Sequence, residues 1–570
     1  MKKELKMYEV PKIESLQDMV LQSARKYGPK IALEDLNDTP LKRLTYRELL
    51  DNILLFGSAL KQLGLKERSH VALIGENRVQ WSLSYLTLMC FNYVIVPIDK
   101  NLTTNEIMNI IHESDSEAII FSGSFASIIA DAKNSLKNLS YYICMDATKE
   151  DKEFNIMPEM IRKATPLDPS KMPIINPNDL AEIIFTSGSL GRAKGVMLSQ
   201  RNLASNLMAM TMMINIVESD RFLSVLPIHH TYECTCGMLC PLFAGASAHY
   251  ARSLKTVVDD LQKVQATILL AVPLLYDKMF KRIMKGIQED KVKSVIVPPL
   301  VKFTNLFTLV GFKEFKKKVF HELHAKFGGS VRLFIAGGAA PDPMVAKGLR
   351  EFGFNFVQGY GLTETSPILA LNRLDAFKDN AAGLPLPGVE IKINNPDEFG
   401  IGEIWAKGPS VMLGYYKNEK ATQDTFDEGW LKTGDIGFYD EDGFLHINGR
   451  KKNVIISKSG KNVFPEEIED VLVRSPFVLE CLVFGEDDPK QGEIISAQIV
   501  VDAEAFIELS ETQKVKITEE LIRKKISEEI EKANKELSAH KLIKKFYIRE
   551  NEFEKTTTQK IKRYLVKNPD

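Results

Sequence analysis

The sequence has few cysteines, almost no net charge and few long runs without charged side chains, of which one could suggest a membrane span. Six cysteines in 570 residues are too few for a disulfide framework, which favours a reducing compartment. The net charge of −1 excludes a globally basic surface for nucleic acid. We therefore expect a cytoplasmic protein with no nucleic-acid partner.

The run without charges extends from Trp81 to Ile98. Its length suits a membrane span. However, Asn92, Tyr93 and Pro97 interrupt it, and its end is β-branched, so we predict a buried helix that leads into a buried strand. Residues 1–10 carry lysines with no apolar segment after them, so we expect no secretory signal.

Helical and strand patterns alternate through the first 180 residues. An amphipathic run reaches from Tyr46 to Leu63, and short apolar runs follow at 70–74, 117–121 and 141–145. Strands separated by segments of helix length predict parallel α/β sheets. After Lys451, basic clusters and lysine- and glutamate-rich helical spacing predict a small α+β unit. We place the domains at 1–451 and 452–570.

A loop of hydroxyls and glycines follows the apolar run at 183–185. It comprises Thr186, Ser187, Gly188, Ser189, Leu190 and Gly191, and it ends at Lys194. Glycines let backbone N–H groups face an anion, and the lysine adds a positive charge, so the loop suits polyphosphate. Because Gly191 is not followed directly by Lys-Ser/Thr, this is not the P-loop of kinases and GTPases. A Ser/Thr/Gly turn that binds no ligand is the alternative.

Three further glycine-rich turns each follow a predicted strand. They are Gly337 to Pro341, Gln358 to Thr365, and Thr433 to Asp435 with Gly449 and Arg450 beyond it. Small residues let a flat base approach the backbone. The carboxylate of Glu364 beside threonine hydroxyls suits Mg²⁺. An aspartate after a Thr-Gly turn suits ribose hydroxyls, and the order of these turns favours a nucleotide site.

Two other features have competing interpretations. Cys234, Cys236 and Cys240 lack paired metal-ligand spacing and have apolar neighbours, so we predict buried thiols. In the helix-rich segment 281–326, an apolar stripe that includes Leu300, Phe303 and Leu306 precedes several lysines. Such a stripe is typical of a packed helix face, and a membrane-surface helix is the alternative.

Taken in this order from about Thr45 to Arg563, the motifs resemble those of the adenylate-forming superfamily, which includes acyl-CoA synthetases and luciferases. The segment from Pro227 to Glu233 is similar to that of long-chain fatty acid–CoA ligases. The resemblance implies a large N-terminal α/β domain of mixed and parallel sheets flanked by helices, with a small β-barrel-like part. It also implies a small, mobile α+β C-terminal domain. In the phosphate loop, Leu190 replaces a hydroxyl residue and Ala193 replaces proline.

The resemblance also implies roles for individual residues. Lys560 is the expected catalytic lysine, although Glu554 and Gln559 replace the family's proline and glycine around it. His230, Tyr232 and Gly337 are expected to contact the acyl group, with His230 beside the carboxylate. Thr186 and Glu364 are expected to hold Mg²⁺, and both, like His230, are expected to act in catalysis. The expected hinge and CoA-binding loop comprise Lys452, Ser459 and Gly460. The expected ATP- or AMP-binding residues are Thr186, Ser187, Gly188, Ser189, Lys194, Gly338, Ala339, Ala340, Gln358, Gly359, Tyr360, Gly361, Thr363, Asp435, Arg450 and Lys560.

The resemblance therefore predicts a ligase that uses ATP, Mg²⁺ and CoA. A fatty acid is first activated as acyl-AMP with release of pyrophosphate, and the acyl group is then transferred to CoA. Transfer to a carrier protein is an alternative, and a non-catalytic nucleotide sensor is a more remote one. A homodimer and a peripheral contact with the inner face of a membrane are also left open.

Overall fold

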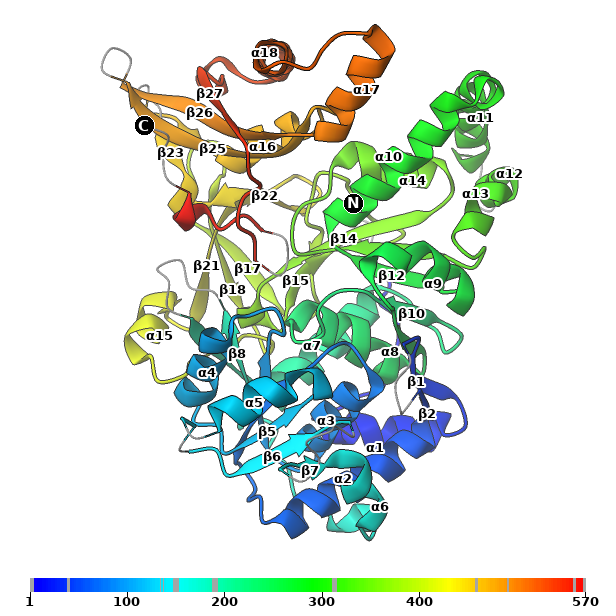
Figure 1. The fold of residues 1–570 in the computed structure, drawn as a ribbon, viewed down its shortest axis with the longest axis vertical. Coiled ribbons are helices and arrows are strands. Elements are labelled where there is room, and N and C mark those ends of the chain that lie inside the picture. Colours follow the sequence, from blue (N-terminus) through cyan, green and yellow to red (C-terminus); the bar gives the residue numbers. More distant parts are fainter. Residues whose placement is uncertain are drawn as a thin grey trace. The chain divides into compact units, whose positions relative to one another are not determined.

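The computed structural model describes residues 5–37, 42–133, 135–136, 138–146, 153–186, 193–309, 315–456, 460–488, 492–556 and 560–566. The chain forms two compact units, shown in Figure 1. The first comprises Met1–Ile391, Ala406–Leu431 and Glu441–Leu445, and the second comprises Lys392–Trp405, Lys432–Asp440 and His446–Asp570. The predicted boundary at 451/452 stays a prediction.

An eight-stranded sheet lies in the first unit. Its order is β19 (Gly414–Tyr415), β9 (Lys194–Ser199), β8 (Leu180–Thr186), β4 (Val94–Ile98), β3 (His70–Ile74), β5 (Ala118–Phe121), β6 (Tyr141–Cys144) and β7 (Asn155–Ile156). Strands β8 to β7 run parallel, whereas β9 is antiparallel to β8 and to β19. Helices of this part are α1 (Leu16–Tyr27), α2 (Tyr46–Leu63), α3 (Val79–Cys90), α4 (Thr104–Glu113), α5 (Ala126–Ala132) and α6 (Met157–Lys163).

A nine-stranded sheet forms the other half of this unit. Its order is β16 (Leu384–Pro385), β15 (Ile368–Leu371), β14 (Asn355–Gly361), β13 (Leu333–Ala336), β12 (Ile268–Ala271), β10 (Arg221–Ser224), β11 (Ser247–Tyr250), β1 (Ile31–Asp35) and β2 (Arg43–Thr45). Strands β14 to β1 are parallel, and the outer strands are antiparallel. Its helices are α7 (Gln200–Met213), α8 (Cys240–Ala244), α9 (Val257–Val264), α10 (Pro273–Glu289), α11 (Lys291–Leu309), α12 (Phe315–Val319), α13 (His321–Lys326) and α14 (Pro343–Glu351). Helix α15 (Glu419–Thr425) packs instead beside β19 of the eight-stranded sheet.

The main core of the first unit forms around α3, whose residues are all buried. Trp81 and Tyr85 of α3 stack with ring centroids 5.4 Å apart. The charge-free run is thus a buried helix followed by the buried strand β4, as predicted, because both sides of each element are covered by protein. Among the residues described, the structure has no helix long and apolar enough to cross a membrane.

A five-stranded sheet contains β17 (Glu390–Asn394), β18 (Gly402–Lys407), β21 (Trp430–Tyr439) and β20 (Phe426–Asp427), with β22 (Leu445–Arg450) on β21. The second unit also holds the pair β23 (Ile455–Ile456) and β24 (Asn462–Val463). Its three-stranded sheet is β25 (Val478–Asp488), β26 (Gly492–Val501) and β27 (Lys545–Arg549). Helices α16 (Pro465–Leu472), α17 (Ala503–Gln513) and α18 (Glu519–Glu536) contribute to its core. The predicted fold class, a large α/β domain with a smaller α+β domain, is confirmed.

Candidate active site

The predicted phosphate loop joins two antiparallel strands. Thr186 ends β8 and pairs with Lys194, which begins β9, so these two residues close the hairpin. The Thr186 hydroxyl donates a hydrogen bond to the Lys194 carbonyl oxygen at 3.4 Å. Ser187, Gly188 and Ser189 lie outside the described residues. The hairpin supports the distinction from a P-loop, in which a helix follows the glycine-rich turn.

A tyrosine links the phosphate-loop lysine to the predicted Mg²⁺ ligand. Strand β19 pairs with β9, which places Tyr415 beside the hairpin. The Lys194 amine lies 4.8 Å from the centroid of the Tyr415 ring, and the Tyr415 hydroxyl donates to Glu364 Oε1 at 2.9 Å. The second carboxylate oxygen of Glu364, together with the Thr186 hydroxyl, provides the type of oxygen donor that Mg²⁺ requires.

The carboxyl end of β14 carries the predicted adenine-binding segment. Tyr360 lies in the antiparallel pairing of β14 with β15 and is half-buried. Gly361 has no room for a side chain, because a Cβ there would lie 1.8 Å from the Pro367 carbonyl oxygen. The Gln358 amide donates to the carbonyls of Asp379 and Ala381, so its side chain positions the neighbouring segment. Thr363 opens the next turn, a short 3₁₀ helix.

The turn after β13 brings together two of the predicted acyl-binding residues. A Cβ at Gly337 would lie 2.5 Å from the Tyr232 ring, so the ring lies against the glycine backbone. Gly338 has a φ of +85°, and it is exposed together with Ala339 and Ala340. An exposed turn without large side chains leaves room for a flat ligand, and nucleotide binding at this turn stays a prediction.

An apolar cavity begins beside Tyr232 and has about 450 Å³ of space that protein atoms do not fill, solvent at its mouth included. Among the described residues, its lining contains no charged side chain and comprises Met210, Ile214, Ile216, Phe222, Tyr232, Cys236, Cys240, Leu270, Ile335, Ala336, Gly359, Ile368 and Leu371. Cys234, Cys236 and Cys240 are buried thiols, as predicted. Residues 232–239 form a π-helix, a rare form often found at functional sites, and it contributes Tyr232 and Cys236 to the cavity wall.

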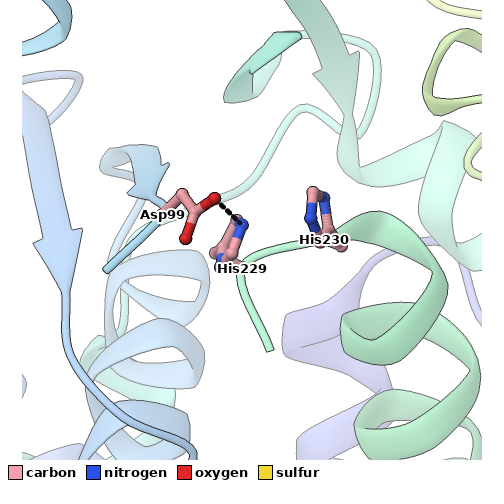
Figure 2. Close-up of side chains that lie close together, drawn as sticks. All are labelled: Asp99, His229 and His230. Atoms are coloured by element: carbon pink, nitrogen blue, oxygen red, sulfur yellow. Dashed lines mark ion pairs between the residues drawn. The ribbon is translucent and has the colours of Figure 1, made fainter. Parts of the chain in front are cut away.

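His230 belongs to a cluster with His229 and Asp99, shown in Figure 2. Asp99 follows β4, and its Oδ2 lies 3.5 Å from Nε2 of the buried His229. The rings of His229 and His230 lie 4.1 Å apart. Asp99 and His229 are therefore neighbours, and the His229 ring packs against His230, the residue predicted to lie beside the substrate carboxylate.

Two fully buried glutamates lie near the π-helix. The Tyr85 hydroxyl donates to Glu182 Oε2 at 3.1 Å. Burial raises the pKa of Glu182 to about 8, and this hydrogen bond lowers it only in part. Burial likewise raises the pKa of Glu233 to about 8. Both groups are therefore largely neutral at pH 7 and act as structural polar groups within the core.

The predicted ribose-binding pair is formed in the second unit. Arg450 Nε lies 2.8 Å from Asp435 Oδ1, and Arg450 Nη1 donates to the Thr433 carbonyl at 3.1 Å. Asp435 is buried, while Arg450 is partly exposed. Lys452 follows in a 3₁₀ turn after β22, and desolvation and then the positive charge of Arg450 lower its pKa. Gly460 has a φ of +75°, and Ser459 lies outside the described residues.

Lys560 lies at the end of a short hairpin; its side chain is accessible to solvent, although protein atoms surround much of its amine. Residues Lys555 and Ile561 form a bridge, and the backbone N–H of Thr556 donates to the Lys560 carbonyl at 2.8 Å. Arg563 then pairs with the buried carboxylate of Glu469. The pKa of Lys560 is lowered, first by desolvation and then by Arg450, whereas Asp435 opposes the shift. The charges of the ribose-binding pair thus act on the predicted catalytic lysine.

Two family models match most of the chain. The AMP-binding enzyme model matches residues 20–416, and the model of the AMP-binding enzyme C-terminal domain matches residues 467–560. The chain belongs to the AMP-binding enzyme family. The predicted membership of the adenylate-forming superfamily is therefore confirmed.

Relatives within this AMP-binding enzyme family include two ligases. A chloroplastic long-chain fatty acid–[acyl-carrier-protein] ligase of Arabidopsis thaliana is 29% identical over 552 residues, with 84% of this chain and 75% of the relative covered. A long-chain fatty acid–CoA ligase of Mycobacterium bovis is 26% identical over 581 residues, with 96% and 94% covered. The solved structure of an anthranilate–CoA ligase with anthranoyl-AMP has a TM-score of 0.77 at 21% identity, with 98% and 96% covered. The family match and these relatives together show that the protein is an AMP-forming acid–thiol ligase.

Sequence reasoning missed three features of this AMP-binding enzyme. Tyr415 was overlooked, although a glycine followed by two aromatic residues was a visible signal. The pairing of Asp99 with His229 joins residues 130 positions apart, and no local pattern reveals it. The buried contact between Tyr85 and Glu182 is equally non-local.

Proposed function

We propose that the protein is a long-chain fatty acid–CoA ligase. The observation that carries the proposal is the apolar cavity that begins beside Tyr232, whose ring lies against the backbone of Gly337. A cavity with no charged lining favours an acid with an extended hydrocarbon tail, because burying polar groups without partners is costly. The carboxylate would then lie toward His230.

The first half-reaction joins two anions, so it requires positive charge where negative charge accumulates. We infer that Lys194 and the hairpin amides bind the outer phosphates of ATP. Thr186 and Glu364 would hold Mg²⁺, which when bound neutralises phosphate charge. Asp435 and Arg450 would bind the ribose, Tyr360 would stack on adenine, and Thr363 would contact the α-phosphate.

Lys560 would lie between the substrate carboxylate and the α-phosphate during attack. Pyrophosphate leaves, and the acid becomes a mixed anhydride with AMP. In the second half-reaction, the thiol sulfur of CoA attacks the acyl carbon, AMP leaves and the thiol proton is released. Lys560 is not required there, and a rotation at Lys452 would bring the loop of Ser459 and Gly460 to the pantetheine arm.

A carrier protein is the second candidate acceptor, since one of the relatives is an acyl-carrier-protein ligase. The test is a panel of acids from short to very long, aromatic acids included, scored by AMP release with no acceptor, with CoA and with acyl carrier protein. We expect long-chain acids and CoA to give the fastest release. Each methylene that fits the cavity should change kcat/KM by about tenfold or more. Preference for short or aromatic acids would refute the proposed substrate, and acceleration by carrier protein alone would refute the proposed acceptor.

A further inference from the structure

Helix α11 carries an apolar stripe that the protein leaves in solvent. The exposed fractions are 64% for Val292, 71% for Val295, 51% for Ile296, 49% for Phe303 and 60% for Leu306, and Pro299 is exposed as well. These six residues, which we call the α11 stripe, follow Val292 at spacings of 3, 4, 7, 11 and 14. At 3.6 residues per turn, such spacings fall within a sector of about 100°.

The opposite side of α11 fixes the orientation of the stripe. Val297, Leu300 and Val301 pack against the core cluster around β12 and β13, and Thr304 is fully buried. Helix α11 lies at the periphery of the first unit beside α10 and α12, as Figure 1 shows. Because its core-facing side is already filled, the stripe cannot turn inward without the loss of those contacts.

Aromatic packing holds the far end of the stripe in place. The Phe303 ring lies 4.8 Å from that of Phe307, and the Phe307 ring lies 5.0 Å from that of Phe315 in α12. Phe303 is therefore preorganised although half of its surface is exposed. Preorganised apolar side chains lose little conformational entropy when another surface covers them.

The segment around the stripe is strongly basic. Residues 277–318 contain eleven lysines and arginines and four acidic residues, a net charge of +7 in a chain whose total is −1. Lys291 and Lys302 border the stripe and are exposed. Among the residues that the structure describes, neither has an acidic partner, whereas Lys293 pairs with Asp290.

We propose that the α11 stripe docks on an anionic phospholipid membrane. Charge complementarity selects this occupant, since apolar side chains bordered by lysines match a surface with negative headgroups over hydrocarbon. The stripe would enter the boundary between headgroups and acyl chains, and Lys291 and Lys302 would contact lipid phosphates. This surface lies outside the groups assigned to catalysis, and its test does not depend on the proposed substrate.

The test is flotation of the full chain with vesicles of phosphatidylcholine, with or without phosphatidylglycerol. We expect binding to the anionic vesicles and weaker binding at high salt. Val295→Glu with Leu306→Glu should weaken vesicle binding at least tenfold. The matched control is Ile174→Glu, because Ile174 is 94% exposed elsewhere in the same unit, and this change should leave binding unaltered.

A second variant removes two exposed positive charges and leaves the packing of α11 untouched. Lys291→Gln with Lys302→Gln should weaken binding to anionic vesicles about fivefold per lysine and leave the melting temperature unchanged. Failure of the unaltered protein to float with anionic vesicles would refute the proposal. So would equal binding by all variants. If the glutamate variants instead changed the sedimentation coefficient while vesicle binding persisted, the stripe would be an interface between copies of the chain, and the membrane assignment would be wrong.

Discussion

The two lysines predicted to act on ATP are held in different ways. Lys194 begins β9, which is paired with β8 on one side and β19 on the other, and its amine lies over the Tyr415 ring. Lys560 is exposed on a short hairpin, which the pairing of Lys555 with Glu480 and of Arg563 with Glu469 attaches to the rest of the second unit. The first arrangement suits a group that binds phosphate in a fixed position. The second suits a group that is needed in one half-reaction and absent from the other.

The largest expected effect comes from Lys560→Ala. Loss of this positive charge should slow adenylate formation about 10²–10³-fold. Thioester formation from supplied acyl-adenylate should change no more than about threefold, a difference too small to reflect loss of a charged contact. Pyrophosphate release and thioester formation are measured separately, with Lys544→Ala as a control because Lys544 is also an exposed lysine of the second unit. Equal damage to both half-reactions would contradict the assigned role.

Arg563→Ala tests the attachment of the hairpin rather than the lysine itself. Arg563 contacts the Glu469 carboxylate and donates to the Val483 carbonyl at 3.1 Å. Its removal leaves a buried carboxyl group, whose pKa burial already raises to about 7, without its cation. We expect adenylate formation to fall about tenfold and the second unit to lose about 1–3 kcal/mol of stability. Arg563→Lys should restore part of both. An unchanged rate would show that other contacts position Lys560.

Tyr415→Phe tests the site around Lys194 and should have a smaller effect than the changes at Lys560 and Arg563. It removes the hydroxyl that orients Glu364 and keeps the ring beneath Lys194. A hydrogen bond to a charged group contributes about 1.5–3 kcal/mol, so the Mg²⁺ concentration for half-maximal pyrophosphate exchange should rise about tenfold or more. Tyr416→Phe is the matched control, since Tyr416 donates instead to Asp115. A similar Mg²⁺ response in both variants would disprove the link to Glu364.

Glu182→Gln should affect activity least and change the pH dependence of stability. The pKa of Glu182 is raised from 4.5 to about 8, so folding favours its protonated form. Its contribution is fully present below the unfolded value and is lost as the pH rises through about 8. The glutamine side chain does not titrate. The melting temperature of this variant should therefore fall less between about pH 6 and about pH 9 than that of the unaltered protein. Parallel melting curves for both proteins would mean that Glu182 does not control this loss.

Local patterns predicted the secondary structure of the first unit well. The amphipathic run became α2 (Tyr46–Leu63), and the charge-free run became α3 and β4, because side-chain periodicity and burial determine these elements. Pairings between distant segments were not predictable from periodicity. The contact of Tyr415 with Glu364 depends on how β19 joins the sheet. Which side of α11 faces solvent likewise depends on how its other side packs against the core.

The burial of all six cysteines has a practical consequence. Burial raises the pKa of Cys90, Cys234, Cys236, Cys240 and Cys481, so these sulfurs react slowly with alkylating reagents. A cysteine introduced at an exposed position of each unit would therefore accept a fluorophore selectively in the otherwise natural sequence. Energy transfer between two such dyes would test the proposed rotation of the smaller unit through a single turnover.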